Sequence, residues 1–293
     1  MKYIKLLWLL IVVLLSGCAG SARLDDRNPS NGGNGQGQGN RTAVIVFNGS
    51  TANISGNGAV FSDRTLTISR GGIYTLSGRL DNGQVLIDTG NNDTVQLVLN
   101  DVTLHNQTGP AIYAPGADEL TITLESGTQN TVSDSARSGT SDQDAAIFIQ
   151  GHLRITGNGS LTVNGVFSHG IRALGSLTIS SGNYIVNTRT NGILSDGAVL
   201  ISGGNIYVTD SYEGIEGRTV TITGGNIKVF SRDDGINASG GTSMNDMFIR
   251  ISGGSIDVYA LRDGLDSNGH IFLEGGTLRV SGPSIHQISI IIH

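Results

Sequence analysis

The stretch VTITGGNIKVFSRDDGINASG, residues 220–240, shows most clearly the alternation that runs through much of this chain. Apolar side chains alternate with polar ones at Val220 and Ile222, and again at Ile227 and Val229, and glycines separate these short runs. Alternation with a period of two is typical of β-strands, and the glycines mark tight turns between them. The stretch therefore predicts about three short strands joined by turns.

The same pattern recurs on both sides of this stretch. Comparable segments begin at Leu153, Leu177, Val199 and Ile249, and a shorter one begins at Ile271. A marker glycine recurs in them at intervals of 22, 22, 21 and 29 residues, at Gly170, Gly192, Gly214, Gly235 and Gly264. A repeat of about 22 residues indicates an all-β solenoid, a parallel β-helix whose equivalent positions stack about 4.8 Å apart. Residues 43–151 carry a weaker version of the pattern, so we expect one solenoid domain rather than two.

Stacking places a row of oxygen-bearing side chains beside the marker glycines. The residue before each glycine is His169, Asn191, Glu213, Asp234 and Asp263 in turn, and the second residue after it is Arg172, Leu194, Glu216, Asn237 and Asp266. Carboxylates about 4.8 Å apart repel one another by about 1 kcal/mol per pair even in water, so either their pKa values rise or a cation lies between the coils. Calcium prefers six to eight oxygen ligands.

We therefore predict one Ca²⁺ between Glu213/Glu216 and Asp234/Asn237 and a second between Asp234/Asn237 and Asp263/Asp266, with Asp233 as an outer or alternative ligand. The alternative interpretation is a solvated acidic turn in which glycine is needed only for its backbone. The three amides Asn183, Asn205 and Asn226 are expected to form a structural ladder of hydrogen bonds.

The N-terminus reads as a targeting segment. Lys2 and Lys5 precede the apolar run Leu6–Leu15, which is too short for a comfortable membrane span, and the run ends in Leu15-Ser16-Gly17-Cys18. This ending resembles a lipobox, in which Cys18 becomes the acylated N-terminus; the alternative is an ordinary secretory signal with a chance cysteine. Because Cys18 is the only cysteine, internal disulfides are excluded. Acids outnumber Lys and Arg by 24 to 18, which disfavours nucleic acid as a partner.

The phrases EGIE (213–216), DDGIN (233–237) and DGLDSNG (263–269), in that order, resemble the bacterial calcium-binding, carbohydrate-binding β-helix family. The resemblance covers most of residues 43–282 and is tightest between Gly203 and Gly276. It implies a single-stranded right-handed parallel β-helix like that of pectate lyases, bound calcium, and binding of cellulose and of acidic sugars such as polygalacturonate. Sugar contacts are expected at Tyr212, Arg232 and Arg262.

Three functions remain open from the sequence. The first is a non-enzymatic, calcium-dependent polysaccharide binder. The second is a pectate-type lyase, whose strong base would have to be Lys228, Arg232 or Arg262. The third is a structural adhesin stapled by calcium. Hydrolysis is disfavoured, because Asp233-Asp234 resembles the aspartate pair of polygalacturonases but lacks their later Gly-His-Gly and Arg-x-Lys.

The expected organisation has four parts. Residues 1–17 form a lipoprotein signal peptide, 18–41 a lipidated cysteine and a flexible Gly/Asn/Gln-rich tether, 42–282 the carbohydrate-binding β-helix, and 283–293 an atypical tail of the kind a truncated or frameshifted terminus would give. We expect an extracytoplasmic monomer on the cell surface that binds polysaccharide, touches the membrane only through its lipid, and prefers acidic plant-type glycans such as polygalacturonate, with cellulose as a second ligand.

Overall fold

A computed structural model describes residues 42–90, 93–137, 141–282 and 285–292 of the chain. Contacts between residues divide the chain into two units, Met1–Gln38 and Gly39–His293, and all of the described residues belong to the second. The predicted signal peptide, Cys18 and the tether to residue 41 lie outside the described residues. In the part that is described, no helix has both the length and the apolar composition required to cross a membrane.

Strands account for nearly all of the regular structure. The first thirteen are β1 (Thr42–Gly49), β2 (Thr51–Gly56), β3 (Ala59–Ser62), β4 (Thr65–Ile68), β5 (Gly72–Leu80), β6 (Gln84–Ile87), β7 (Thr94–His105), β8 (Ile112–Ala114), β9 (Glu119–Leu124), β10 (Gln129–Ser133), β11 (Ala145–Ile149), β12 (His152–Gly157) and β13 (Ser160–Gly165). The others are β14 (His169–Ala173), β15 (Leu177–Ile179), β16 (Asn183–Thr188), β17 (Ile193–Ile201), β18 (Asn205–Asp210), β19 (Ile215–Ile222), β20 (Asn226–Ser231), β21 (Ile236–Ala238), β22 (Phe248–Ala260), β23 (Leu265–Ser267), β24 (His270–Gly282) and β25 (Ile285–Ile292). A 3₁₀ turn, η1 (Met244–Asp246), lies within the long interval between Gly235 and Gly264.

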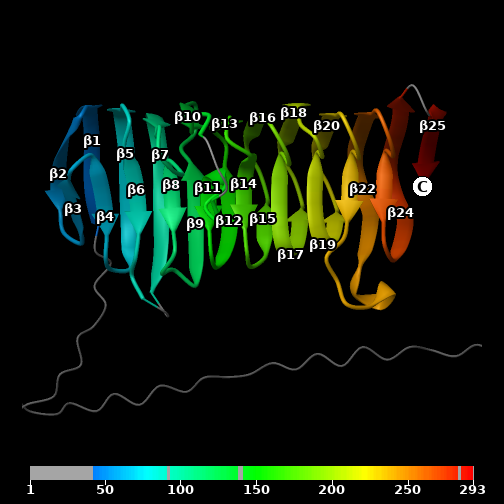
Figure 1. Cartoon of the computed structure of the whole chain (residues 1–293), viewed down its shortest axis with the longest axis horizontal. Coiled ribbons are helices and arrows are strands. Elements are labelled where there is room, and N and C mark those ends of the chain that lie inside the picture. Colours follow the sequence, from blue (N-terminus) through cyan, green and yellow to red (C-terminus); the bar gives the residue numbers. More distant parts are fainter. Residues whose placement is uncertain (1–41, 91–92, 138–140, 283–284, 293) are drawn as a thin grey trace, which may run out of the picture. The chain divides into compact units, whose positions relative to one another are not determined.

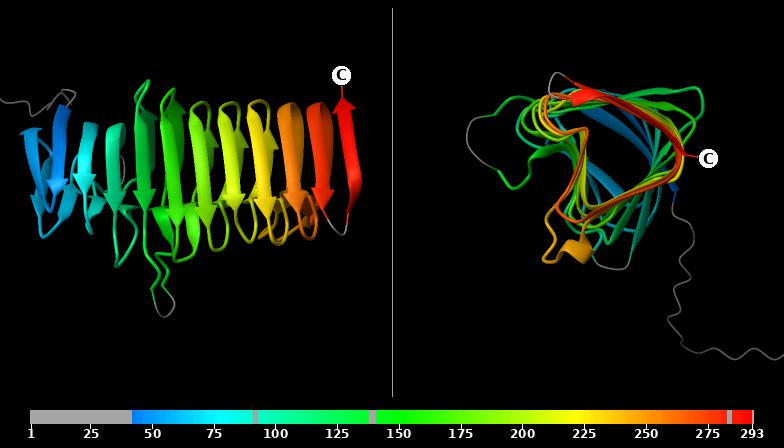
Figure 2. Two further views of the ribbon diagram at one scale, coloured as in Figure 1. Left: turned by 90° about the horizontal axis from the view of Figure 1, so that it is seen from above. Right: turned by 90° about the vertical axis from the view of Figure 1, so that its right-hand side faces the viewer.

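All 25 strands belong to one sheet, in which most strands pair in parallel with strands of the preceding and following repeats. Figure 1 shows these strands stacked in chain order from β1 to β24. Seen along the stack, the strands enclose a central core (Figure 2). The marker positions are in register, because Ile171, Ile193, Ile215, Ile236 and Leu265 pair successively across β14, β17, β19, β21 and β23.

The all-β class is confirmed, but the expected single-stranded right-handed parallel β-helix with 22-residue coils is corrected. The structure is a closed sheet of 25 strands, in which the offset between parallel partners varies from 19 residues at Thr65↔Gln84 to 35 at Ile112↔Ile147. Three hairpins, β1–β2, β3–β4 and β24–β25, are antiparallel. The repeat could not reveal this, because turns of different length connect equally well paired strands. In addition, β1 to β4 and β25 lie outside the regular segments.

The core is a set of stacked apolar rows. Val199, Val220 and Ile249 are successive partners, each fully buried, and Ile201, Ile222 and Ile251 form the next inward row. Alternate residues face outward, so β20 reads exposed and buried in turn along most of its length. Near the two ends of the sheet, β2 pairs antiparallel with β1 and β25 pairs antiparallel with β24. This pairing leaves fewer unpaired backbone groups at the ends.

Candidate metal centre

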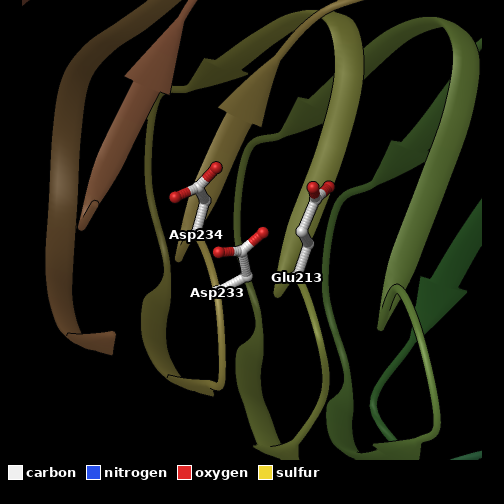
Figure 3. Close-up of side chains that lie close together, drawn as sticks. All are labelled: Glu213, Asp233 and Asp234. Atoms are coloured by element: carbon white, nitrogen blue, oxygen red, sulfur yellow. The ribbon is translucent and has the colours of Figure 1, made fainter. Parts of the chain in front are cut away.

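Three carboxylates converge where two neighbouring repeats turn. Glu213 lies between β18 and β19, and Asp233 and Asp234 lie between β20 and β21. One carboxylate oxygen from each residue lies within 4.8 Å of the other two. Figure 3 shows the three side chains gathered at the ends of adjacent strands; we call them the carboxylate cluster. Asp233 and Asp234 are each only 5% exposed, so solvent screens their charges poorly.

The marker glycines bring these acids together. Gly214 donates its N–H to the carbonyl of Asp234 over 3.1 Å, and Gly235 donates to that of Asp263 over 2.8 Å. A methyl group on Gly214 would collide with Val229 and with the carbonyl oxygen of Gly235. Only glycine therefore allows successive turns to nest so closely, and the nesting stacks the acids that precede it.

The second predicted row is also in register. Glu216, Asn237 and Asp266 are successive partners on β19, β21 and β23. Asn237, 7% exposed, donates its amide to Glu213 Oε2 over 3.4 Å. Its carbonyl oxygen Oδ1 is buried and has no hydrogen-bond partner among the described residues. A buried amide oxygen without a partner, on a side chain that contacts one of the converging carboxylates, is an arrangement that a cation would satisfy.

Two further residues hold the glutamates in place. The amide of Asn191 donates to Glu213 Oε2 over 2.9 Å and to Glu216, and the hydroxyl of Ser239 donates to Glu216 Oε1 over 2.6 Å. Asn191 occupies the same position as Glu213 one repeat earlier, so the sequence repeat could have indicated that the two side chains lie close together. Ser239 lies two residues after Asn237, outside both predicted rows, and no sequence signal indicated its contact with Glu216.

The electrostatics of the cluster disfavour full ionisation. Burial, followed by the hydrogen bond and the charge of Glu216, raises the pKa of Glu213 to about 7. Burial also raises the pKa of Asp234, as does repulsion from Asp233 and Asp266, although a hydrogen bond from the N–H of Asp263 opposes the change. These shifts have the direction that burial and neighbouring like charges give to carboxylates.

The remaining predicted ligands lie at the edge of the cluster. The side chain of Asp263 is exposed, whereas its backbone N–H donates to Asp234 Oδ1 over 3.1 Å. Asp266 is half-buried and pairs in register with Asn237. Within the described part of the chain, the group of converging acids contains Asp233, expected as an outer or alternative ligand, and does not include Glu216, Asp263 or Asp266.

The predicted sugar-contacting residues separate into two groups. Arg262 forms an ion pair with Asp233 at 3.1 Å while remaining largely exposed, and the hydroxyl of Tyr212 hydrogen bonds to the same carboxylate, which raises the pKa of the tyrosine. Both therefore lie at the rim of the cluster. Arg232 is instead held by Asp210, at 3.3 Å, and by the carbonyl of Arg189, at 2.6 Å.

Comparison with known proteins identifies relatives. A family profile described as "Carbohydrate-binding domain-containing protein" matches residues 62–219 and 188–289. A protein of that description from Acetivibrio thermocellus is 34% identical over 184 residues, which are 61% of this chain and 62% of the relative. The match thus spans less than two thirds of that relative's length.

A solved structure is also similar. It is described as "Structure of the polysaccharide lyase-like protein from C. thermocellum, Gadolinium derivative", and it superposes with a TM-score of 0.70 at 31% identity, covering 79% of this chain and 96% of that one. The family profile covers more than half of the sequence, including the whole carboxylate cluster. The chain therefore belongs to the family of carbohydrate-binding domain-containing proteins.

Proposed function

We propose that this protein binds acidic polysaccharide through Ca²⁺ held at the carboxylate cluster. The observation that carries the proposal is the convergence of Glu213, Asp233 and Asp234, together with the buried oxygen of Asn237, which has no hydrogen-bond partner in the described part of the chain. Calcium prefers carboxylate and amide oxygens in such a mixed set. Glu216 accepts from the same amide of Asn191 as Glu213, which places another carboxylate next to the cluster. The similar solved structure is a gadolinium derivative, and gadolinium is likewise a hard cation that prefers oxygen ligands.

An acidic sugar suits the rim of this site. A bound Ca²⁺ would leave coordination positions for outside oxygens, and the carboxylate of a uronate supplies them. Arg262 and Tyr212 lie beside Asp233 and are exposed, so they can contact the same sugar. These features support a preference for polygalacturonate over neutral chains at the cluster.

The test is calorimetric titration of polygalacturonate into the protein with and without Ca²⁺. Asp234→Asn keeps the acceptor for the N–H of Asp263 but removes one charge, so calcium-dependent binding should be lost. The matched control is Asp118→Asn, the same change at an exposed acid before β9, which should bind like the original protein. Calcium at about 100 times its Kd should also stabilise the original protein by about 2.7 kcal/mol, and Asp234→Asn much less.

Other results would favour the alternatives. Ultraviolet absorbance from an unsaturated product in the same mixture would replace the binder with a lyase. Calcium stabilisation without any effect on polysaccharide binding would make the cluster a structural staple. Equal binding by Asp234→Asn and Asp118→Asn would contradict the proposed site.

The proposal extends to the location of the protein. A signal of the lipobox type ending at Cys18, followed by a Gly/Asn/Gln-rich segment, supports a lipid-anchored protein displayed outside the cytoplasm. On this proposal the membrane is contacted through the lipid alone, and the carbohydrate-binding unit acts as a monomer.

A further inference from the structure

A groove of about 460 Å³ crosses the outer face of five neighbouring strands, β13, β16, β18, β20 and β22, which pair in parallel. Two in-register rows of outward side chains line most of it. One row contains Asn183, Asn205 and Asn226, and the other contains Ile185, Tyr207 and Lys228. Because paired strands lie about 4.8 Å apart, the groove presents a surface that repeats along the stack.

The asparagine row has hydrogen-bonding capacity to spare. Asn205 donates to Asn183 Oδ1 over 2.8 Å and accepts from the amide of Asn226 over 2.9 Å. A carboxamide has two N–H donors and an oxygen with two lone pairs, so the ladder leaves Asn205 one donor and one acceptor site. The three amides are exposed, and such paired donor and acceptor sites match hydroxyl groups, which both donate and accept.

The second row supplies apolar surface without net charge. The ring of Tyr207 is 38% exposed and Ile185 is 46% exposed, so both can cover the C–H face of a sugar ring. Lys228 and its in-register partner Asp257 are the charged residues that line the groove, and their formal charges cancel. A neutral, hydroxyl-rich ligand is therefore a better match for the groove than a polyanion.

The groove is separate from the carboxylate cluster. Asn205 and Asn226 begin β18 and β20, whereas the cluster follows the far ends of these strands. A six-residue strand spans about 20 Å, so the amide row and the cluster cannot hold the same sugar unit. We propose that the groove is a second carbohydrate site, independent of calcium, which binds an extended chain of neutral sugars along the stack of strands. It goes beyond the function proposed for the cluster, because it requires neither a metal nor an acidic sugar.

The experiment is calorimetric titration of the full chain with cellohexaose, a linear oligosaccharide of neutral glucose units, in the presence of EDTA. Tyr207→Ala should weaken binding about fivefold to tenfold by removing the exposed ring. Tyr259→Ala is the matched control, because Tyr259 is 40% exposed, contacts the same ring of Phe230, and does not line the groove. Asn205→Ser should also weaken binding. The variant should fold normally, because serine already occupies the same row at Ser160 and Ser255.

Each outcome decides the proposal. Binding in EDTA that is weakened by Tyr207→Ala and Asn205→Ser but unchanged in Tyr259→Ala would support it, provided that circular dichroism and melting temperatures show folded variants. Absence of cellohexaose binding, loss of binding when calcium is removed, or equal effects of the two tyrosine substitutions would overturn it. Failure of the cluster proposal would appear separately, as calcium-insensitive binding of polygalacturonate.

Discussion

At the scale of single residues, the carboxylate cluster combines charge repulsion with burial. Glu213 is held by amides of Asn191 and Asn237, and Asp234 by one backbone N–H, while Arg262 pairs with Asp233 from the rim. Hydrogen bonds therefore orient the oxygens without neutralising most of the charge. Such a site is stabilised either by protons or by a cation, and these two compete.

Glu213 should make the stability of the metal-free protein depend on pH. Its pKa in the folded protein is about 7, above the ordinary 4.5, so the folded state binds this proton more tightly than the unfolded state. The resulting stabilisation is complete below about pH 4.5 and is lost as the pH rises towards 7. Urea titrations in EDTA should show this loss, and Glu213→Gln should reduce it. A loss of equal size in the variant would contradict the assignment.

A side chain at the marker glycine Gly235 should destabilise the fold. A methyl group there would press on Val258 and lie 2.6 Å from the carbonyl oxygen of Gly264, which is fixed by backbone pairing. We expect Gly235→Ala to reduce the free energy of unfolding by about 1–3 kcal/mol. Gly109→Ala is the control, since the methyl would meet its nearest neighbours at an ordinary 3.5 Å. Similar losses in urea titrations of the two variants would refute the explanation.

At the scale of the elements, the inward face of each strand packs the core and the outward face forms the surface. Inward rows such as Ile201, Ile222 and Ile251 pack the core, and outward rows such as the asparagine ladder form the surface. Strand stacking therefore gives neighbouring residues of similar chemistry entirely different roles.

Two adjacent residues of β17 test this separation. Ile201 is fully buried and Leu200 is 37% exposed, so truncating the first leaves a cavity and truncating the second does not. We expect Ile201→Ala to lower the free energy of unfolding by about 2–5 kcal/mol and Leu200→Ala to change it much less. Denaturant unfolding monitored by circular dichroism would measure both values, and comparable losses would show that the faces are not distinct.

At the scale of the whole molecule, the proposed anchor predicts where the protein is found. Acylation of Cys18 should hold it in the membrane fraction of the cells that produce it, and Cys18→Ser should move it to the soluble fraction. Fractionation followed by immunoblotting would measure the distribution. Retention of Cys18→Ser in the membrane fraction would contradict a lipid anchor, and an unchanged melting temperature of the variant would confirm that its fold is intact.

The sequence by itself determined the β structure, the stacking of the repeats and the alignment of the marker glycines, because these depend on alternation and spacing along the chain. It also brought Glu213, Asp234 and Asn237 into one expected site, since equivalent positions stack. Only the folded structure shows that the sheet closes and that its terminal hairpins are antiparallel, because pairing direction leaves no period in the sequence. It alone placed Asp233 inside the cluster, Arg232 on Asp210, and Ser239 against Glu216, because the direction of a side chain within a turn depends on its packed neighbours.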